Sequence, residues 1–182
     1  MKARLAQIEQ AARDAGFTDV RPLDMRALIF HPETRELCEQ NLCGKYAHNW
    51  SCPPSCPRPS DMARRVTGYS TGILVQTRDK LIYENDLQAI EVLRNIHNRR
   101  FYLFAQSMRG IYGAILPMGS GECRICRRCT CPDDPCRHPD RRVSAMEAYG
   151  LFIGEVCEAS GMCYQYHADD RLMGLVSCVL FP

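Results

Sequence analysis

Cysteines are concentrated in two segments of this chain, and thiolates are ligands for soft metal ions and iron–sulfur clusters. The first segment reads CEQNLCGKYAHNWSCPPSCP from Cys38, and the second reads CRICRRCTCPDDPCRHP from Cys123. The chain has 12 cysteines in 182 residues, which would suit a disulfide framework in a small secreted protein. No export signal is evident, so we expect the thiols to bind metal or to take part in catalysis.

The second segment has the stronger metal-binding pattern. Cys123, Cys126 and Cys129 follow a C-x2-C-x2-C spacing, and Cys136 comes after a longer gap. Three closely spaced thiolates with a more distant fourth are typical of a 4Fe-4S site. Because the last gap is longer than in the bacterial ferredoxin run, the sequence leaves open whether Cys136 or Cys131 is the fourth ligand. A four-thiolate zinc site is the alternative.

The first segment has the spacing C-x4-C-x8-C-x3-C, formed by Cys38, Cys43, Cys52 and Cys56. This pattern alone is weak, because zinc sites prefer gaps of two to four residues within each pair. Prolines next to the last two cysteines limit how far their loop can relax, which suits a preorganised ligand loop. We call residues 38–56 the first cysteine motif and residues 123–136 the second cysteine motif.

These motifs carry a resemblance to a known family. The stretches RELCEQNLCGKYAHNWSCPPSCP, CRICRRCTCPDDPCRHP and SAMEAYG resemble a bacterial and archaeal family of predicted metal-binding proteins, a domain of unknown function. The resemblance implies metal or iron–sulfur binding and no settled reaction. The ligands that it implies are Cys38, Cys43, Cys52, Cys56, Cys123, Cys126, Cys129 and Cys136.

Cationic side chains surround the second cysteine motif and would stabilise an anionic cluster. They are Arg124, Arg127, Arg128, Arg137, Arg141 and Arg142. A nucleic-acid interface is not expected, because interleaved aromatic residues are missing and the formal net charge is only +2.

Three residues inside the first cysteine motif are candidates for a substrate pocket. Lys45, Asn49 and Trp50 lie between its cysteines, where their side chains can approach a bound metal or an anionic group. If one cluster has only three cysteine ligands, its open iron can bind a small substrate, and redox or desulfurising chemistry is then favoured over hydrolysis. If all eight cysteines are ligands, the clusters only relay electrons.

The remaining cysteines and two histidines have less specific patterns. Cys157 and Cys163 are either packing residues, a redox pair or extra ligands, and Cys178 lies in an apolar strand where a core role is expected. His48 and His138 each lie inside a cysteine motif, where surface or supporting roles are favoured over ligation.

Periodicity indicates the elements that must position these motifs. We expect a helix that Gly16 ends, a long helix from Asn85 to Phe104, and a third from a capping box at Ser144–Glu147. Strands are expected over residues 17–25, 71–77, 111–121 and 172–181. We expect 71–77 and 111–121 to be neighbours and to bring both motifs to one region of the fold.

The order of elements predicts an α/β or α+β fold with one mixed sheet, flanking helices and two cysteine-rich loops, in a single domain over residues 1–182. The N-terminus lacks the apolar run of a signal peptide or membrane helix, so we expect a cytoplasmic protein. The leading function is an iron–sulfur protein, with one or two 4Fe-4S clusters, that passes electrons to a partner protein or to a small-molecule substrate. The alternative is a zinc-stabilised interaction module without redox activity. Oligomeric state is not indicated.

Overall fold

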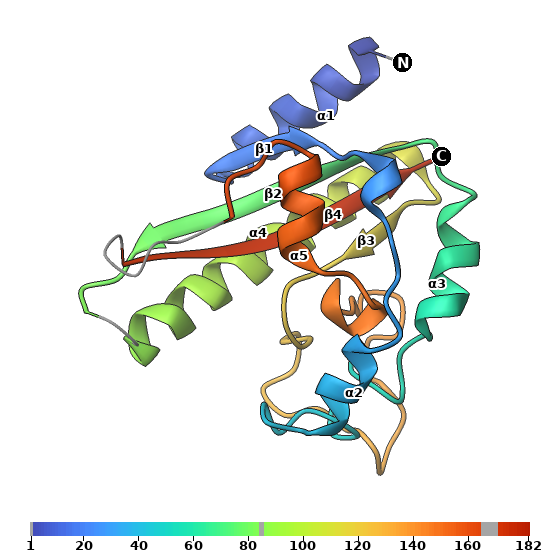
Figure 1. Ribbon diagram of the computed structural model, residues 1–182, viewed down its shortest axis with the longest axis vertical. Helices are drawn as coiled ribbons and strands as arrows, with labels where there is room; N and C mark the ends of the chain where they lie inside the picture. Colours follow the sequence, from blue (N-terminus) through green and yellow to red (C-terminus); the bar gives the residue numbers. More distant parts are fainter. Residues whose placement is uncertain (1, 84–85, 165–170) are drawn as a thin grey trace.

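The computed structural model describes residues 2–83, 86–164 and 171–182 (Figure 1). Its four strands are β1 (Asp19–Pro22), β2 (Thr71–Lys80), β3 (Leu116–Met118) and β4 (Leu172–Phe181), and they form one sheet in the order β1-β2-β4-β3. The four expected strands are therefore present and the fold is α+β, but Ile111 and Tyr112, expected to begin the third strand, belong instead to the helix before it.

The expectation of a mixed sheet with β2 next to β3 is wrong. All three hydrogen-bonded strand pairs are antiparallel, and β4 pairs with β2 on one side and with β3 on the other. Because β2 and β3 both run opposite to β4, the long crossover between them joins two parallel strands with β4 inserted between them. Local sequence shows the crossover, but it does not show that the last strand of the chain enters the gap.

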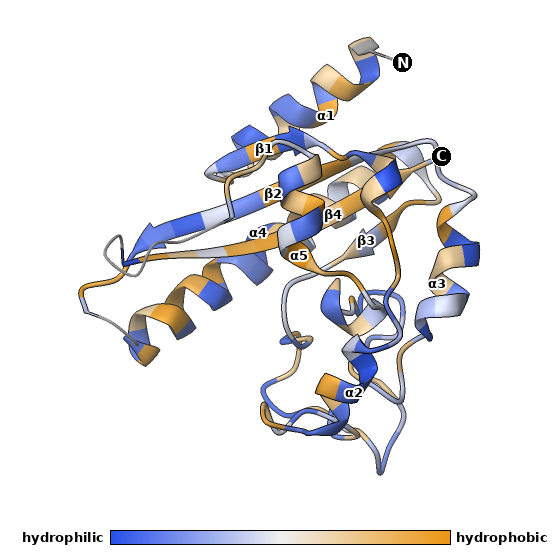
Figure 2. Cartoon of the chain, in the orientation of Figure 1, coloured by the Kyte–Doolittle hydropathy of each residue, from blue (hydrophilic) through white to orange (hydrophobic). Residues whose placement is uncertain are grey.

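Successive side chains of the central strands point to opposite faces of the sheet, and both faces are buried. On β2, Ile73 and Val75 join the core that also contains Phe101, whereas Leu74 joins the opposite core with Met146. Figure 2 shows hydrophobic colours along most of β4, as expected for a strand buried on both faces.

Helices cover both faces. Helices α1 (Lys2–Asp14) and α4 (Leu87–Tyr112) pack on one face, and α3 (Pro59–Val66) and α5 (Ile153–Ala159) lie over the other. Gly16 has φ of +89° directly after α1, which confirms it as the end of that helix. Asp86 caps α4, since its side chain accepts a hydrogen bond from the Ala89 backbone at 3.0 Å; Asn85 lies outside the described residues.

The helix expected at the Ser144 capping box is wrong. Gly119 donates a backbone hydrogen bond to Ser144 and accepts one from Met146, at 2.8 and 2.9 Å. These backbone groups are therefore already paired with the end of β3, and a helix cannot begin at Ser144. A 3-10 helix follows at Glu147–Tyr149 instead. This pairing helps to fix the point where the chain leaves the sheet for the second cysteine motif.

A buried histidine is a polar link between α4 and the two central strands. His97 is fully buried, and its ring nitrogens lie 2.9 Å from the Thr77 hydroxyl and 2.8 Å from the Ser177 hydroxyl. Burial lowers the pKa of His97 to about 3. The imidazole is therefore neutral in the folded protein over most of the pH range.

We predict that this histidine makes the protein less stable in acid. The unfolded chain protonates His97 near its ordinary pKa of 6.5, whereas the folded protein resists protonation to about pH 3. Its contribution is therefore present above pH 6.5 and is lost as the pH falls toward 3, by up to about 5 kcal/mol. Urea unfolding between pH 7 and 4 measures this slope. His97→Gln keeps hydrogen-bonding capacity without titrating, so a slope unchanged in that variant would contradict the prediction.

Candidate metal centre

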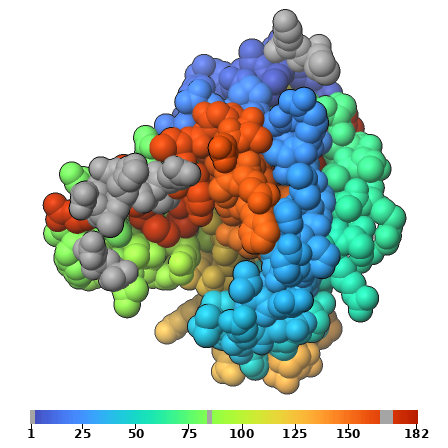
Figure 3. All heavy atoms as spheres, viewed as in Figure 1, coloured from blue at the N-terminus to red at the C-terminus, as the bar shows by residue number. Residues whose placement is uncertain are grey.

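The two cysteine motifs lie side by side at one end of the molecule, below the sheet (Figures 1 and 3). The first begins within α2 (Thr34–Glu39), which contacts the 3-10 helix Glu147–Tyr149, and the second comes after β3. Hydrogen bonds across more than 70 positions of sequence join them: Asn49 to Cys123, and Trp50 to Asp134. The prediction that both motifs occupy a common region is confirmed, although β2 and β3 are not neighbours.

A buried polar network forms the closest link between the motifs. The Asn49 side chain donates to the Cys123 carbonyl at 3.0 Å and accepts from the backbone and hydroxyl of Ser51 at 3.0 and 2.9 Å. The Cys123 backbone N–H in turn donates to the Ser51 hydroxyl at 2.8 Å. Asn49 is 5% exposed and Ser51 is fully buried. Loss of any of these hydrogen bonds would therefore leave a buried polar group unpaired, which is destabilising.

The thiols of the first cysteine motif form an electrostatically linked group. Burial, then the charge of neighbouring thiols, raises the pKa of Cys52 to about 12, with Ser51 opposing the shift. Those neighbours are Cys43 and Cys56, and in the same way the charge of Cys43 raises the pKa of Cys38, and that of Cys38 raises the pKa of Cys56. Thiols whose ionisation is disfavoured by neighbouring thiols are suited to a shared cation, which would hold them as thiolates.

An arginine contacts the innermost of these thiols. Arg35 donates a hydrogen bond from Nη2 to the Cys56 sulfur at 3.4 Å. Burial raises the pKa of Cys56, and the nearby Arg35 guanidinium opposes that rise. The same cation opposes the rise that burial causes in the pKa of Cys38.

The second cysteine motif surrounds a small cavity of about 20 Å³. Its lining includes all four predicted thiols: Cys123, Cys126, Cys129 and Cys136. Cys131 is not part of this lining. Its sulfur donates to the Ala47 carbonyl at 3.4 Å and lies 3.9 Å from the Ser55 hydroxyl, so it contacts the loop of the first motif.

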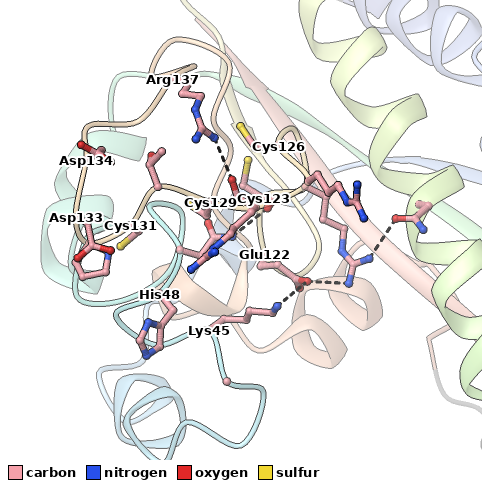
Figure 4. Close-up of a pocket in the computed structure, with 18 of the residues that line it drawn as sticks. Lys45, His48, Glu122, Cys123, Cys126, Cys129, Cys131, Asp133, Asp134 and Arg137 are labelled. Carbon is pink, nitrogen blue, oxygen red and sulfur yellow. Dashed lines mark hydrogen bonds and ion pairs between the residues drawn. The ribbon is translucent and has the colours of Figure 1, made fainter.

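A larger open groove of about 1030 Å³ adjoins the second motif (Figure 4). Lys45 and Asn49 line it, together with Cys123, Cys126 and Cys129. An ion-pair chain crosses its wall, in which Glu122 contacts Lys45 at 3.9 Å and Arg124 at 2.7 Å. Arg124 also pairs with Glu91 on α4, so its charge is largely neutralised. Figure 4 shows Cys131 away from Cys126, toward Asp133.

Trp50 does not line this groove. Its indole N–H donates to the Asp134 carbonyl at 3.0 Å, and its side chain borders the cavity formed by the four thiols of the second motif. Of the three residues expected in one pocket, Lys45 and Asn49 line the groove, and Trp50 borders the neighbouring thiol cavity instead. A tryptophan in this place limits the access of water to the thiols.

The donor set suits a thiophilic metal, but the side chains are not yet gathered around one point. Among the residues that the structure describes, no three Cys, His, Asp or Glu side chains are in metal-binding geometry. All 12 cysteines are described, and none forms a disulfide. Two neighbouring groups of four thiols fit thiolate coordination by residue type and placement, and ligation would require their loops to close further.

The remaining candidates have ordinary surroundings. Cys157 and Cys178 are fully buried in the core on the α5 face, which agrees with the core role expected for Cys178 and with the packing alternative for Cys157. Cys163 is exposed. His48 lines the groove, and His138 borders the thiol cavity.

Sequence reasoning missed three residues that contact the motifs. They are Arg35, Ser51 and Tyr102, the last of which hydrogen-bonds Cys123 from α4. Burial, then the charge of Cys123, raises the pKa of Tyr102. Only the position of Arg35, three residues before Cys38 on a short helix, is a signal that a sequence reader could use.

Comparison with known proteins gives one match. The model of a family described as predicted metal-binding protein (DUF2284) matches residues 21–181. No curated protein and no solved structure shows a significant match to the chain. Across the described residues, no helix is both long enough and apolar enough to span a bilayer.

Proposed function

The chain belongs to this family of predicted metal-binding proteins, and on that premise we propose that its cysteine motifs hold two 4Fe-4S clusters. Cys38, Cys43, Cys52 and Cys56 would hold one, and Cys123, Cys126, Cys129 and Cys136 the other. When bound, such clusters supply one-electron transfer. The free thiols suit a reducing compartment, and cytoplasmic location stays a prediction.

The small cavity of the second motif supports this proposal most directly. Four thiols line it, and three of them have the two-residue gaps that favour a cluster over zinc. The cavity includes Cys136, whereas Cys131 contacts the first motif, which favours Cys136 as the fourth ligand.

The surrounding residues would protect and join the two centres. Asn49 and Ser51 hold the backbone of Cys123 against the first motif, so the two ligand sets keep a fixed relation. Trp50 borders the thiol cavity, where its ring would shield a bound centre from water. This arrangement suits a short electron path between centres, because tightly coupled ligand loops keep the distance between them small.

The open groove supports a small-molecule substrate more than a purely carrier role. It lies against four thiols of the second motif, those of Cys123, Cys126, Cys129 and Cys131, and Lys45 and Asn49 offer a cation and an amide there. A small anionic or polar molecule bound to them would be next to the second centre. Redox or desulfurising chemistry is the proposed reaction class, and a partner protein at the same groove is the alternative electron acceptor.

Metal analysis after anaerobic purification tests the proposal. We expect a brown protein with broad visible absorption, about eight iron atoms and about eight acid-labile sulfides per chain, as two cubanes require. About four of each would indicate that only one motif binds a cluster. Zinc without iron would contradict the proposal and support the zinc-stabilised interaction module.

A further inference from the structure

Arg35 lies at the centre of contacts that join α2 to the end of the first cysteine motif. It is on α2 one turn before Cys38, so both side chains face the same side of that helix. Its Nη2 atom lies 3.4 Å from both the sulfur and the carbonyl oxygen of Cys56 and also donates to the Pro57 carbonyl. One guanidinium therefore contacts a predicted ligand atom and the backbone that carries it.

A second observation concerns the other side of the same guanidinium. The Nε atom of Arg35 is buried, and it has no hydrogen-bond acceptor among the residues that the structure describes. Buried donors are nearly always paired in folded proteins. An unpaired donor next to a group of thiols therefore points to an acceptor that arrives with the metal.

We propose that Arg35 is a positioning residue of the first metal centre, whose guanidinium donates to the Cys56 thiolate and orients it toward the metal. This inference rests on the proposed function, in which Cys56 is a ligand. Residues that hydrogen-bond to metal ligands fix ligand orientation and tune the metal, and their loss costs about 10- to 100-fold in metal affinity.

The type of residue matters for this role. The Nη2 atom shares its two N–H groups among the Cys56 sulfur and two carbonyl oxygens, and the planar guanidinium fixes the direction in which those N–H groups point. A lysine has the same charge, but its N–H donors are all on one freely rotating ammonium group. A hydrogen bond to a thiolate also withdraws electron density from the sulfur, which stabilises the more reduced state of a bound cluster and lowers the energy of the sulfur lone pair.

A simpler role would be that of a backbone clasp. In that case Arg35 would hold the carbonyls of Cys56 and Pro57, and its loss would weaken metal binding only by loosening the loop. The energy of the thiolate-to-metal charge-transfer band distinguishes the two roles, because it depends on hydrogen bonds to the sulfur. If Arg35 only holds the backbone, its loss leaves that band unchanged for the metal that still binds.

Cobalt(II) is a suitable probe, since it binds thiolate sites and reports them by charge-transfer absorption whether the resident metal is iron or zinc. The metal-free full-length chain is titrated anaerobically as wild type, Arg35→Met and Arg35→Lys. Arg64→Met is the control, because Arg64 is an exposed α3 arginine whose side chain contacts Asp61. Cys56→Ser identifies the binding phase that belongs to the first motif.

We expect Arg35→Met to weaken the first-motif phase about 10- to 100-fold and to shift its charge-transfer band to lower energy, with the second-motif phase unchanged. Arg64→Met should match wild type. If Arg35→Met does not fold by circular dichroism, Arg35→Lys decides: we expect the band to shift there too, because a freely rotating ammonium does not hold an N–H in the fixed direction of the guanidinium.

Two results would overturn the inference. One is that Arg35→Met binds cobalt(II) at the first motif as tightly as wild type does. The other is that it binds more weakly while its charge-transfer band stays at the wild-type energy, in which case Arg35 only holds the backbone of the loop. Failure of the proposed function would give a different result. Wild-type protein and Cys56→Ser would then bind cobalt(II) identically, because the first motif would not bind metal.

Discussion

Cys126→Ser is expected to remove the metal of the second cysteine motif, about half of the iron in a chain with two equal clusters. Cys126 is the middle thiol of the C-x2-C-x2-C run and lines both the thiol cavity and the groove. The loop around it contains little regular structure, so metal binding contributes directly to its folding free energy. Iron content and melting temperature should therefore fall together. Both are measured on anaerobically purified protein.

The matched control for this substitution is Cys178→Ser. Cys178 is fully buried in β4, in the core on the α5 face, and is in neither cysteine motif. A buried hydroxyl in its place costs about 1–3 kcal/mol if it stays unpaired, with iron content unchanged. If Cys126→Ser kept full iron content and wild-type melting, Cys126 would not be a ligand.

Asn49→Leu is expected to destabilise the protein by about 3 kcal/mol, because it breaks the link between the two cysteine motifs. Leucine is close to asparagine in size but pairs with neither the Cys123 carbonyl nor the Ser51 backbone and hydroxyl. These groups are buried and would be left without their partners. The change in unfolding free energy is measured by denaturant titration, with metal content determined on the same samples.

A control for the Asn49 substitution lies in the same loop. Ser55 is only partly buried, and its hydroxyl makes a long contact of 3.9 Å with the Cys131 sulfur, so Ser55→Ala should change stability by less than about 0.5 kcal/mol. A lower metal content in Asn49→Leu would show that the link also positions ligands. Equal stability of Asn49→Leu and wild type would mean that the two motifs are held together by other contacts.

Much of the local structure was predictable because it depends on residues close together in the sequence. The apolar period of α4 predicted that helix as far as Phe104, although it continues to Tyr112, and the branched apolar run predicted most of β2. The C-x2-C-x2-C spacing likewise predicts a shared site for three thiols, because a short loop keeps them close in any fold. The four thiols around one cavity agree with that expectation.

Other local signals failed because tertiary contacts competed with them. The serine and glutamate of the Ser144 capping box are placed correctly for a helix start, yet the backbone on either side of Ala145 pairs with Gly119. Cys131 follows Cys129 closely in the sequence, but its side chain packs against Ala47 in the other motif. Spacing alone does not give the direction of a side chain when a distant segment can contact it.

The sequence by itself therefore determined the elements and the residue types available for metal binding. Only the tertiary structure decided what surrounds them. It inserted β4 between β2 and β3, joined the motifs through Asn49, and brought Arg35 to the Cys56 sulfur. These contacts form between segments that are far apart in the chain or turn on a single side-chain direction. Their free energy depends on burial and on the pairing of polar groups, and neither can be seen from the order of residues.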